Sequence, residues 1–192
     1  MRFKVMTKWY AAAGLLLLCA CGGGSNLTVR TPDGKAKEVA VKSGAFLNVP
    51  DSTSSGQVTR HLVCVANYEM TLPPGARASN LEARVDRAEQ VKVCFKLNGP
   101  VGFDEGAPIK AATYPVASFS GPYQPDKVGT TGTTIHLFEN GAERKEYFNS
   151  AHMKGQVEIT SASADTVSGE INLTDGKSEI KGGFRAEKVK KS

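Results

Sequence analysis

Three short segments in the last third of the chain share one pattern, a glycine followed by alternating apolar residues. They begin at Gly155, Gly169 and Gly182, and each reads Gly-x-apolar-x-apolar. This alternation is typical of a half-buried β-strand and places each glycine on the same face as its apolar pair. A glycine there marks a bend or a close approach of two backbones, unless it is only a poor strand position beside a turn. The first interpretation predicts consecutive strands in a curving sheet, either a barrel or a bent sandwich.

Turn chemistry and alternation predict further strands upstream. Residues 27–30 and 37–42 flank Pro32-Asp33-Gly34 and predict a hairpin, and residues 133–138 and 143–148 predict another around Asn140-Gly141. Single strands are predicted at residues 60–72, 90–97 and 114–119, and the first of these begins with a nearly continuous apolar run that indicates burial on both faces. Residues 51–56 are rich in Ser and Gly and are expected to form a loop. The expected fold class is mostly β, with an antiparallel-dominated curved sheet.

One short helix is predicted near residues 80–89. Ser79 and Glu82 have the spacing of a capping box, and Leu81, Val85 and Ala88 fall on one helical face. Because the helix joins the strands 60–72 and 90–97, these strands would be parallel after a crossover or antiparallel after a simple return. The sequence leaves both arrangements open.

The start of the chain has the features of a cleavable leader. Basic residues precede an apolar run from Ala11 to Leu18, which is shorter than the roughly 20 residues that span a bilayer. Leu18-Cys19-Ala20-Cys21 then resembles the lipobox of bacterial lipoproteins. This resemblance implies cleavage before Cys21 and acylation of its sulfur, which would fix the chain to a membrane through several acyl chains (palmitate or a similar fatty acid). An ordinary secretory signal followed by a free cysteine is the alternative.

The resemblance sets the expected domain organisation and location. Residues 1–20 would be the signal peptide, residues 21–26 the lipidated cysteine with a flexible tether, and residues 27–192 a single β-rich domain. An Asp directly after the acylated cysteine would resemble an inner-membrane retention signal, but this position is Gly22. The expected location is therefore the periplasmic face or surface of the outer membrane. The C-terminal β meander also resembles uncharacterised bacterial envelope lipoproteins, and that pattern implies no activity.

Charge gives little reason to expect nucleic acid as a partner. The formal net charge of the whole chain is +5, but the leader carries Arg2, Lys4 and Lys8 and no acidic residue, so the remaining chain is only weakly basic. The basic end of the chain, Lys188, Lys190 and Lys191, is read as a solvated chain end rather than a lipid-headgroup patch. The expected partners are the membrane, which the lipid anchor at Cys21 implies, and an envelope protein.

Cys64 and Cys94 remain as a pair in what would be an oxidising compartment. They share a face only if Val63 and Val65 occupy the core while Leu62 and Ala66 lie on a far side that a helix or loop covers. A disulfide is favoured because an exposed free thiol is a liability there. The competing arrangement buries Cys64 as a small apolar residue and leaves Cys94 a partly exposed thiol.

Motifs that would indicate catalysis or cofactor binding are missing from the sequence. It contains no G-x-S-x-G, H-E-x-x-H, Walker or dinucleotide-binding pattern and no C-x-x-C spacing. The remaining candidates are the separated His61, His136 and His152, a soft-metal set of Met70 with His152-Met153, the adjacent Asp104-Glu105, and a ligand mouth of Tyr68, Tyr114, Phe119 and Tyr123.

The sequence therefore predicts no catalytic residue, no metal site and no cofactor. The favoured function is a lipid-anchored envelope protein with a non-catalytic structural or protein-binding β domain. A carrier of a small apolar ligand inside a β-barrel and an envelope enzyme of unknown chemistry are the alternatives. A large apolar cavity would favour the carrier, and a cleft with mutually perturbed titratable groups would favour the enzyme.

Overall fold

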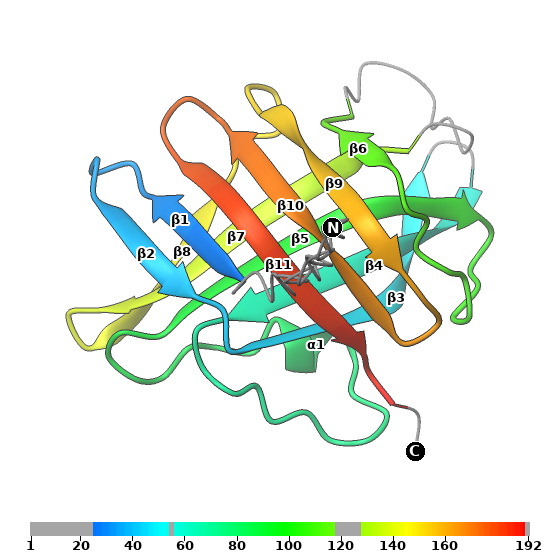
Figure 1. Ribbon diagram of the computed structural model, residues 1–192, viewed down its shortest axis with the longest axis horizontal. Helices are drawn as coiled ribbons and strands as arrows, with labels where there is room; N and C mark the ends of the chain where they lie inside the picture. The colour runs from blue at the N-terminus through cyan, green and yellow to red at the C-terminus, as the bar shows by residue number, and fades with distance from the viewer. Residues whose placement is uncertain (1–24, 54–55, 118–127, 191–192) are drawn as a thin grey trace, which may run out of the picture.

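The computed structural model describes residues 25–53, 56–117 and 128–190 (Figure 1). These residues form one sheet of eleven strands and one short helix. The elements are β1 (Asn26–Arg30), β2 (Ala36–Ala40), β3 (Ser43–Thr53), β4 (Gly56–Ala66), α1 (Ala78–Leu81), β5 (Val91–Val101), β6 (Thr113–Pro115), β7 (Thr130–Glu139), β8 (Ala142–Tyr147), β9 (Lys154–Ala162), β10 (Thr166–Thr174) and β11 (Glu179–Lys188).

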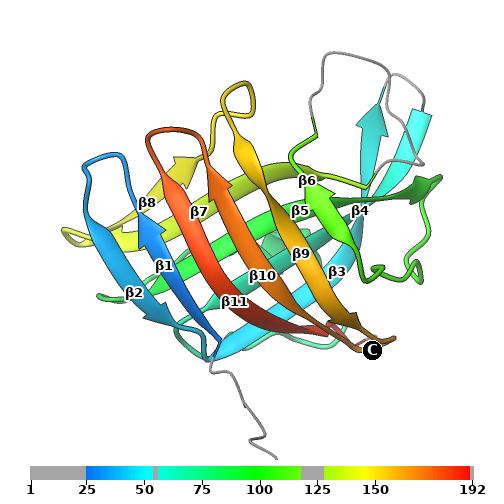
Figure 2. The ribbon, with the colours of Figure 1, turned by 45° about the horizontal axis from the view of Figure 1, so that its top comes forward.

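The sheet folds over on itself and makes two layers. Its strand order is β6-β9-β10-β11-β3-β4-β5-β7-β8, with β1 and β2 added beside β11. Strand β11 makes the transition between the layers, because its first residues pair with β1 while Glu187 and Lys188 pair in parallel with Ala45 and Phe46 of β3. Figure 2 shows the strands of the two layers crossing over each other. The terminal strands β6 and β8 do not pair, so the described strands form a bent sandwich and not a closed barrel.

The mostly β, antiparallel-dominated class is confirmed, and several strand limits differ from those expected. Strand β4 begins earlier than residue 60 and ends at Ala66, and β6 is shorter than the predicted strand 114–119, whose last two residues lie outside the described residues. Strand β3 was not predicted, and it continues to Thr53 into the expected loop. Both hairpins are present, and the Asn140-Gly141 turn has the two positive φ angles, 53° and 79°, of the tight turn expected there.

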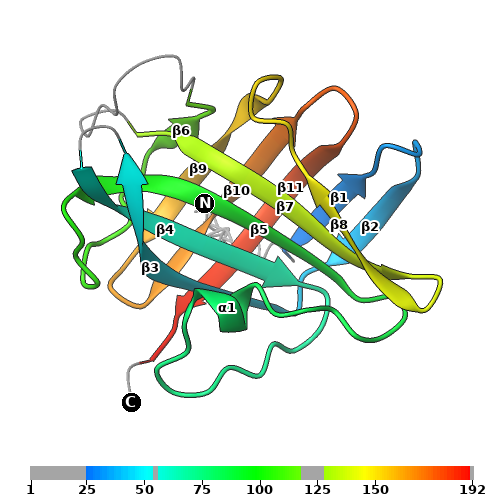
Figure 3. The same cartoon turned by 180° about the vertical axis from the view of Figure 1, so that it is seen from behind.

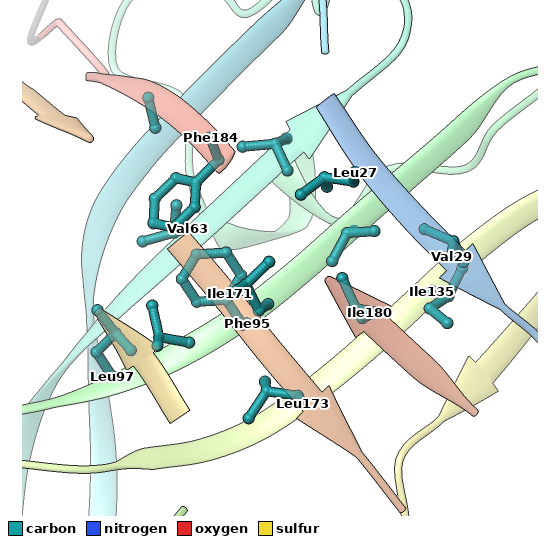
Figure 4. Close-up of a cluster of buried hydrophobic side chains, with 14 of the residues drawn as sticks. Leu27, Val29, Val63, Phe95, Leu97, Ile135, Ile171, Leu173, Ile180 and Phe184 are labelled. Atoms are coloured by element: carbon teal, nitrogen blue, oxygen red, sulfur yellow. The ribbon is translucent and has the colours of Figure 1, made fainter. Parts of the chain in front are cut away.

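The main hydrophobic core fills the space between the two layers. Figure 4 shows side chains that enter it from both sides. The rings of Phe95 on β5 and Phe184 on β11 meet edge to face, with their centroids 5.1 Å apart. Val63 and Val65 of β4 face this core, whereas Leu62 and Cys64 face the opposite side. Strand β4 is therefore buried on both faces, as its apolar run indicated.

The glycines of the C-terminal repeat lie where neighbouring backbones approach closely. A Cβ atom on Gly169 would lie 2.0 Å from the carbonyl oxygen of Glu158, and one on Gly155 would lie 2.0 Å from that of Asn172. A Cβ atom on Gly182 would lie 2.1 Å from the carbonyl oxygen of Asn26. No side chain fits at such distances, so the interpretation of a close backbone approach is confirmed. Glycine here lets consecutive strands curve around the core.

The predicted helix is shorter and begins earlier than expected. Helix α1 is a single turn, Ala78–Leu81, and residues 82–90 follow without helical structure. The prediction of a capping box between Ser79 and Glu82 is wrong. Arg77 is the N-cap residue, and its backbone N–H donates to Oδ1 of Asn80 at 2.8 Å. Packing decides this outcome, because a helix of this length has little stability of its own.

A second, smaller apolar cluster lies on the outer side of β3, β4 and β5. Leu62, Cys64, Cys94 and Ala45 form its base, and the fully buried Leu81 covers them from α1. Figure 3 shows α1 on this outer side of the layer. The segment between β4 and β5 thus acts as a cover for one face of the sheet.

Candidate functional site

Cys64 and Cys94 form a disulfide within the second apolar cluster. They stand directly opposite each other on β4 and β5, with Cα atoms 4.1 Å apart. The strands are antiparallel, so the chain makes a simple return between them and not a parallel crossover. Val63 and Val65 take the core side, and α1 covers the other side, which is the arrangement that the sequence required for a bridge.

The predicted lipidation site, Cys21, lies outside the described residues. Ser25 is the first described residue, and it lines a groove of about 540 Å³ between residues 69–74, the start of β3 and the end of β11. Four basic residues also line this groove, which we call the basic groove: Lys42, Arg185, Lys188 and Lys190. Glu69 and Glu187 are its acidic members. Within the described ranges, no helix is long and apolar enough to cross a membrane.

A buried polar pair stands at one end of the main core. Asn48 on β3 lies directly opposite His61 on the neighbouring strand β4, and only 6% and 2% of their surfaces are exposed. Nδ2 of Asn48 lies 2.9–3.0 Å from the carbonyl oxygens of Asp104, Glu105 and Ala107. Carbonyl oxygens only accept hydrogen bonds, so the atom that faces them is the amide nitrogen. Asn48 therefore ties the loop after β5 to the sheet.

This orientation of Asn48 determines the protonation of His61. The other side-chain atom of Asn48, Oδ1, lies 2.7 Å from Nδ1 of His61. Because Oδ1 is an acceptor, Nδ1 must carry the proton and donate it. Burial lowers the pKa of His61 to about 4, and the positive charge of Lys188 adds to the shift. The ring is neutral at ordinary pH, and its Nε2 atom carries a lone pair.

His61 lines a pocket of about 290 Å³, which we call the His61 pocket. Its apolar walls come from Pro100, Ala107, Pro108, Tyr114 and Val128, and Asp104 and Lys110 also line it. Gly99 lies against the imidazole, because a Cβ atom there would be 3.0 Å from Nε2. No hydrogen-bond partner of Nε2 occurs among the residues of ranges 25–53, 56–117 and 128–190.

Lys92 is buried on the outer face of β5, beside the second apolar cluster. Its Nζ donates to the carbonyl oxygen of Leu81 at 2.8 Å and to that of Ala83. Burial lowers the pKa of Lys92 to about 8, although Glu143 and Glu82 oppose this shift. The side chain thus holds the end of α1 against the sheet.

His136 and Glu143 extend the same polar cluster across β7 and β8. His136 stands opposite Lys92, and its Nδ1 lies 3.0 Å from Oε1 of Glu143. Burial lowers the pKa of His136, partly offset by Glu143. Burial alone would raise the pKa of Glu143, but hydrogen bonds from His136 and from the Val85 backbone N–H lower it overall. This carboxylate also holds the covering segment in place.

The structure separates the other candidates that the sequence suggested. Met70 packs on the second apolar cluster, whereas Met153 is buried in the main core beside exposed His152, so no soft-metal set forms. No group of three or more His, Cys, Asp or Glu side chains could hold a metal ion in the described part of the chain. Asp104 and Glu105 are exposed.

The expected aromatic ligand mouth does not assemble among its described members. Tyr68 lines a groove with the covering segment, and Tyr114 lies in the His61 pocket. Phe119 and Tyr123 lie outside the described residues.

Two features were missed by sequence reasoning, the pairing of Asn48 with His61 and the burial of Lys92. Asn48 gave a signal, because a lone amide interrupts the apolar residues of 45–49. Lys92 gave none, since it alternates with Val91 and Val93 as a solvent-facing residue would. No protein-family model, curated protein or solved structure matches this chain.

Proposed function

We propose that the protein is a bacterial envelope lipoprotein, anchored in the outer membrane through acylated Cys21, with a non-catalytic structural or protein-binding β domain. The lipobox-like Leu18-Cys19-Ala20-Cys21 supports the anchor. The Cys64–Cys94 disulfide supports an oxidising compartment outside the cytoplasm.

The position of Ser25 also supports the anchor. Only three residues separate Cys21 from Ser25, and an extended chain reaches at most about 3.6 Å per residue. An acylated Cys21 would therefore hold the basic groove within roughly 15 Å of the lipid surface. Lys42, Lys188 and Lys190 would then lie near headgroups, which are often anionic, so this proposal replaces the solvated chain end expected from the sequence with a lipid-facing one.

The packed core between the layers is the observation that supports a module that is not a ligand carrier. Side chains from both layers occupy the space that a ligand carrier would keep empty, and the contact of Phe95 with Phe184 crosses it. A large apolar cavity inside the sandwich is what a carrier requires. The sheet is also open rather than closed, and this supports the non-carrier interpretation further.

The cluster of Lys92, His136 and Glu143 is the arrangement that comes nearest to an enzyme site. Its titratable groups perturb one another, as catalytic groups do. However, Lys92 donates to two backbone carbonyls, and Glu143 accepts from a backbone amide. These groups already have partners that fix the covering segment, so we assign the cluster a structural role.

Fatty-acid labelling tests the anchor. Cells that express the full chain are grown with radioactive palmitate, and the protein is isolated and counted. We expect label on the native chain and none on Cys21→Ser. Cys19→Ser is the matched control and should keep its label, since it leaves Ala20-Cys21 intact. Label that persists on Cys21→Ser would remove the anchor from the proposal.

Native mass spectrometry tests the carrier alternative. The purified chain should have the mass of the polypeptide with its acyl groups and nothing more. A stoichiometric apolar molecule that dissociates on denaturation and is too large for the His61 pocket of about 290 Å³ would restore the carrier.

A further inference from the structure

Nε2 of His61 is a hydrogen-bond acceptor beside an open pocket. The side chain is 2% exposed, and its only hydrogen bond among the described residues runs through Nδ1 to Asn48. Among the described residues, Thr133 Oγ1 and not Nε2 is the side-chain polar atom that is both buried and without a partner, so Nε2 keeps contact with solvent. Water or a ligand in the His61 pocket can therefore donate a hydrogen bond to it.

The surroundings hold His61 in one tautomer. Asn48 cannot turn over, because its amide nitrogen is within hydrogen-bond distance of three carbonyl oxygens. Nδ1 of His61 consequently remains the donor and Nε2 the acceptor. A partner of Nε2 must donate a hydrogen bond, which excludes ligand groups that only accept.

Glycine at position 99 keeps this acceptor accessible. A Cβ atom there would lie 3.0 Å from Nε2 of His61 and 2.7 Å from the carbonyl oxygen of Thr59. A side chain at this position would both clash with backbone and cover the imidazole. The chain thus has the one residue type that leaves room beside Nε2.

The walls of the His61 pocket determine the shape and polarity of what fits. Pro100, Ala107, Pro108 and Val128 present apolar surface, and the rest of the wall includes the polar residues Asn98, Asp104 and Lys110. Tyr114 presents its ring, because its hydroxyl already donates to the Lys110 carbonyl at 3.0 Å and accepts from the Lys110 N–H at 3.1 Å. The volume of about 290 Å³ lies at the small end of ligand sites.

We propose that the His61 pocket binds a small ring compound that packs on its apolar wall and donates one O–H or N–H hydrogen bond to Nε2 of His61. The site borders the main core, which contributes Tyr114 to its wall, and it does not depend on the lipid anchor. It adds small-molecule recognition to the proposed envelope module.

Phenol and toluene provide the test, because they have nearly the same shape and only phenol donates a hydrogen bond. Both are titrated into the Cys21→Ser chain, which carries no acyl group at that position. Long-range ¹⁵N–¹H NMR spectra of the histidine side chains follow the binding. We expect phenol to shift the Nε2 resonance of His61 while the Nδ1–H resonance stays in place, and to bind at least about fivefold more tightly than toluene.

His61→Phe removes the acceptor and keeps an aromatic ring, so it should abolish the preference for phenol. His152→Phe, at an exposed histidine, is the matched control and should retain it. If His61→Phe does not fold, the comparison of phenol with toluene on the unmutated pocket decides alone. Toluene binding as tightly as phenol, or phenol binding with no change at His61, would overturn the proposal.

Discussion

Cys64 of β4 lies directly opposite Cys94 of β5, and their bridge joins two antiparallel neighbours beneath the covering segment of residues 67–90. Both cysteines are buried, with 0% and 3% of their surfaces exposed. The bridge therefore ties the base of the second apolar cluster together where the chain leaves the sheet and returns to it.

We expect the loss of this disulfide to lower the free energy of unfolding by about 3–4 kcal/mol, the chain-entropy value for a loop of 30 residues. Urea unfolding of the oxidised chain and of the Cys64→Ala/Cys94→Ala chain measures the difference. Without reduction, alkylation in denaturant should add no alkyl group at Cys64 or Cys94. Alkylation of both thiols under those conditions would contradict the bridge.

Gly169→Ala should destabilise the domain by at least about 2 kcal/mol, because the new Cβ would meet the Glu158 carbonyl oxygen at 2.0 Å. Gly132→Ala is the matched control. Gly132 also lies in a strand, but nothing stands within 4 Å of its Cβ position and its φ is not positive. It should change stability by less than about 1 kcal/mol. Equal unfolding midpoints for the two variants would contradict the close approach.

Stability should fall on acidification because of His61. Its folded-state pKa of about 4 lies below the ordinary value of 6.5, so the unfolded chain binds more protons between these values. The free energy of unfolding should therefore drop by about 2 kcal/mol between pH 7 and pH 4.5 from this group. His136 acts in the same direction, because burial also lowers its pKa.

Urea unfolding at several pH values checks this dependence. His61→Gln should show a clearly weaker pH dependence, whereas His152→Gln, at the exposed histidine, should match the unmutated chain. An unchanged slope in His61→Gln would show that His61 is not buried in its neutral form.

Lys92→Met should loosen the covering segment while it leaves the sheet intact. Methionine keeps most of the buried aliphatic volume but loses the hydrogen bonds to the carbonyls of Leu81 and Ala83. We expect the Val85 amide, which donates to Glu143, to exchange its proton roughly tenfold faster. Lys154→Met, at an exposed position of β9, should leave that rate unchanged. Faster exchange throughout β4 and β5 would instead indicate loss of the whole layer.

Local chemistry was sufficient to predict most strands. The alternation of residues 133–138 and the Asn140-Gly141 turn predict their hairpin, since both signals act within a few residues. The prediction of a helix at residues 80–89 was wrong in extent. Lys92, on the next strand, and Glu143, which is distant in the sequence, hold residues 81–85 by their backbone groups. Strand β3 was missed because its polar end, residues 51–53, resembles a loop.

The sequence by itself determined the β character of the domain, the curvature at Gly155, Gly169 and Gly182, and the single face on which Cys64 and Cys94 could meet. Side-chain alternation and the lack of a Cβ atom are properties of residues that are neighbours in the chain. Only the tertiary structure decided that β11 joins the two layers and that Asn48 orients His61 beside a pocket. Those relations depend on contacts between segments far apart in the chain. Burial of apolar surface and pairing of polar groups select such contacts together, and no local sequence pattern encodes them.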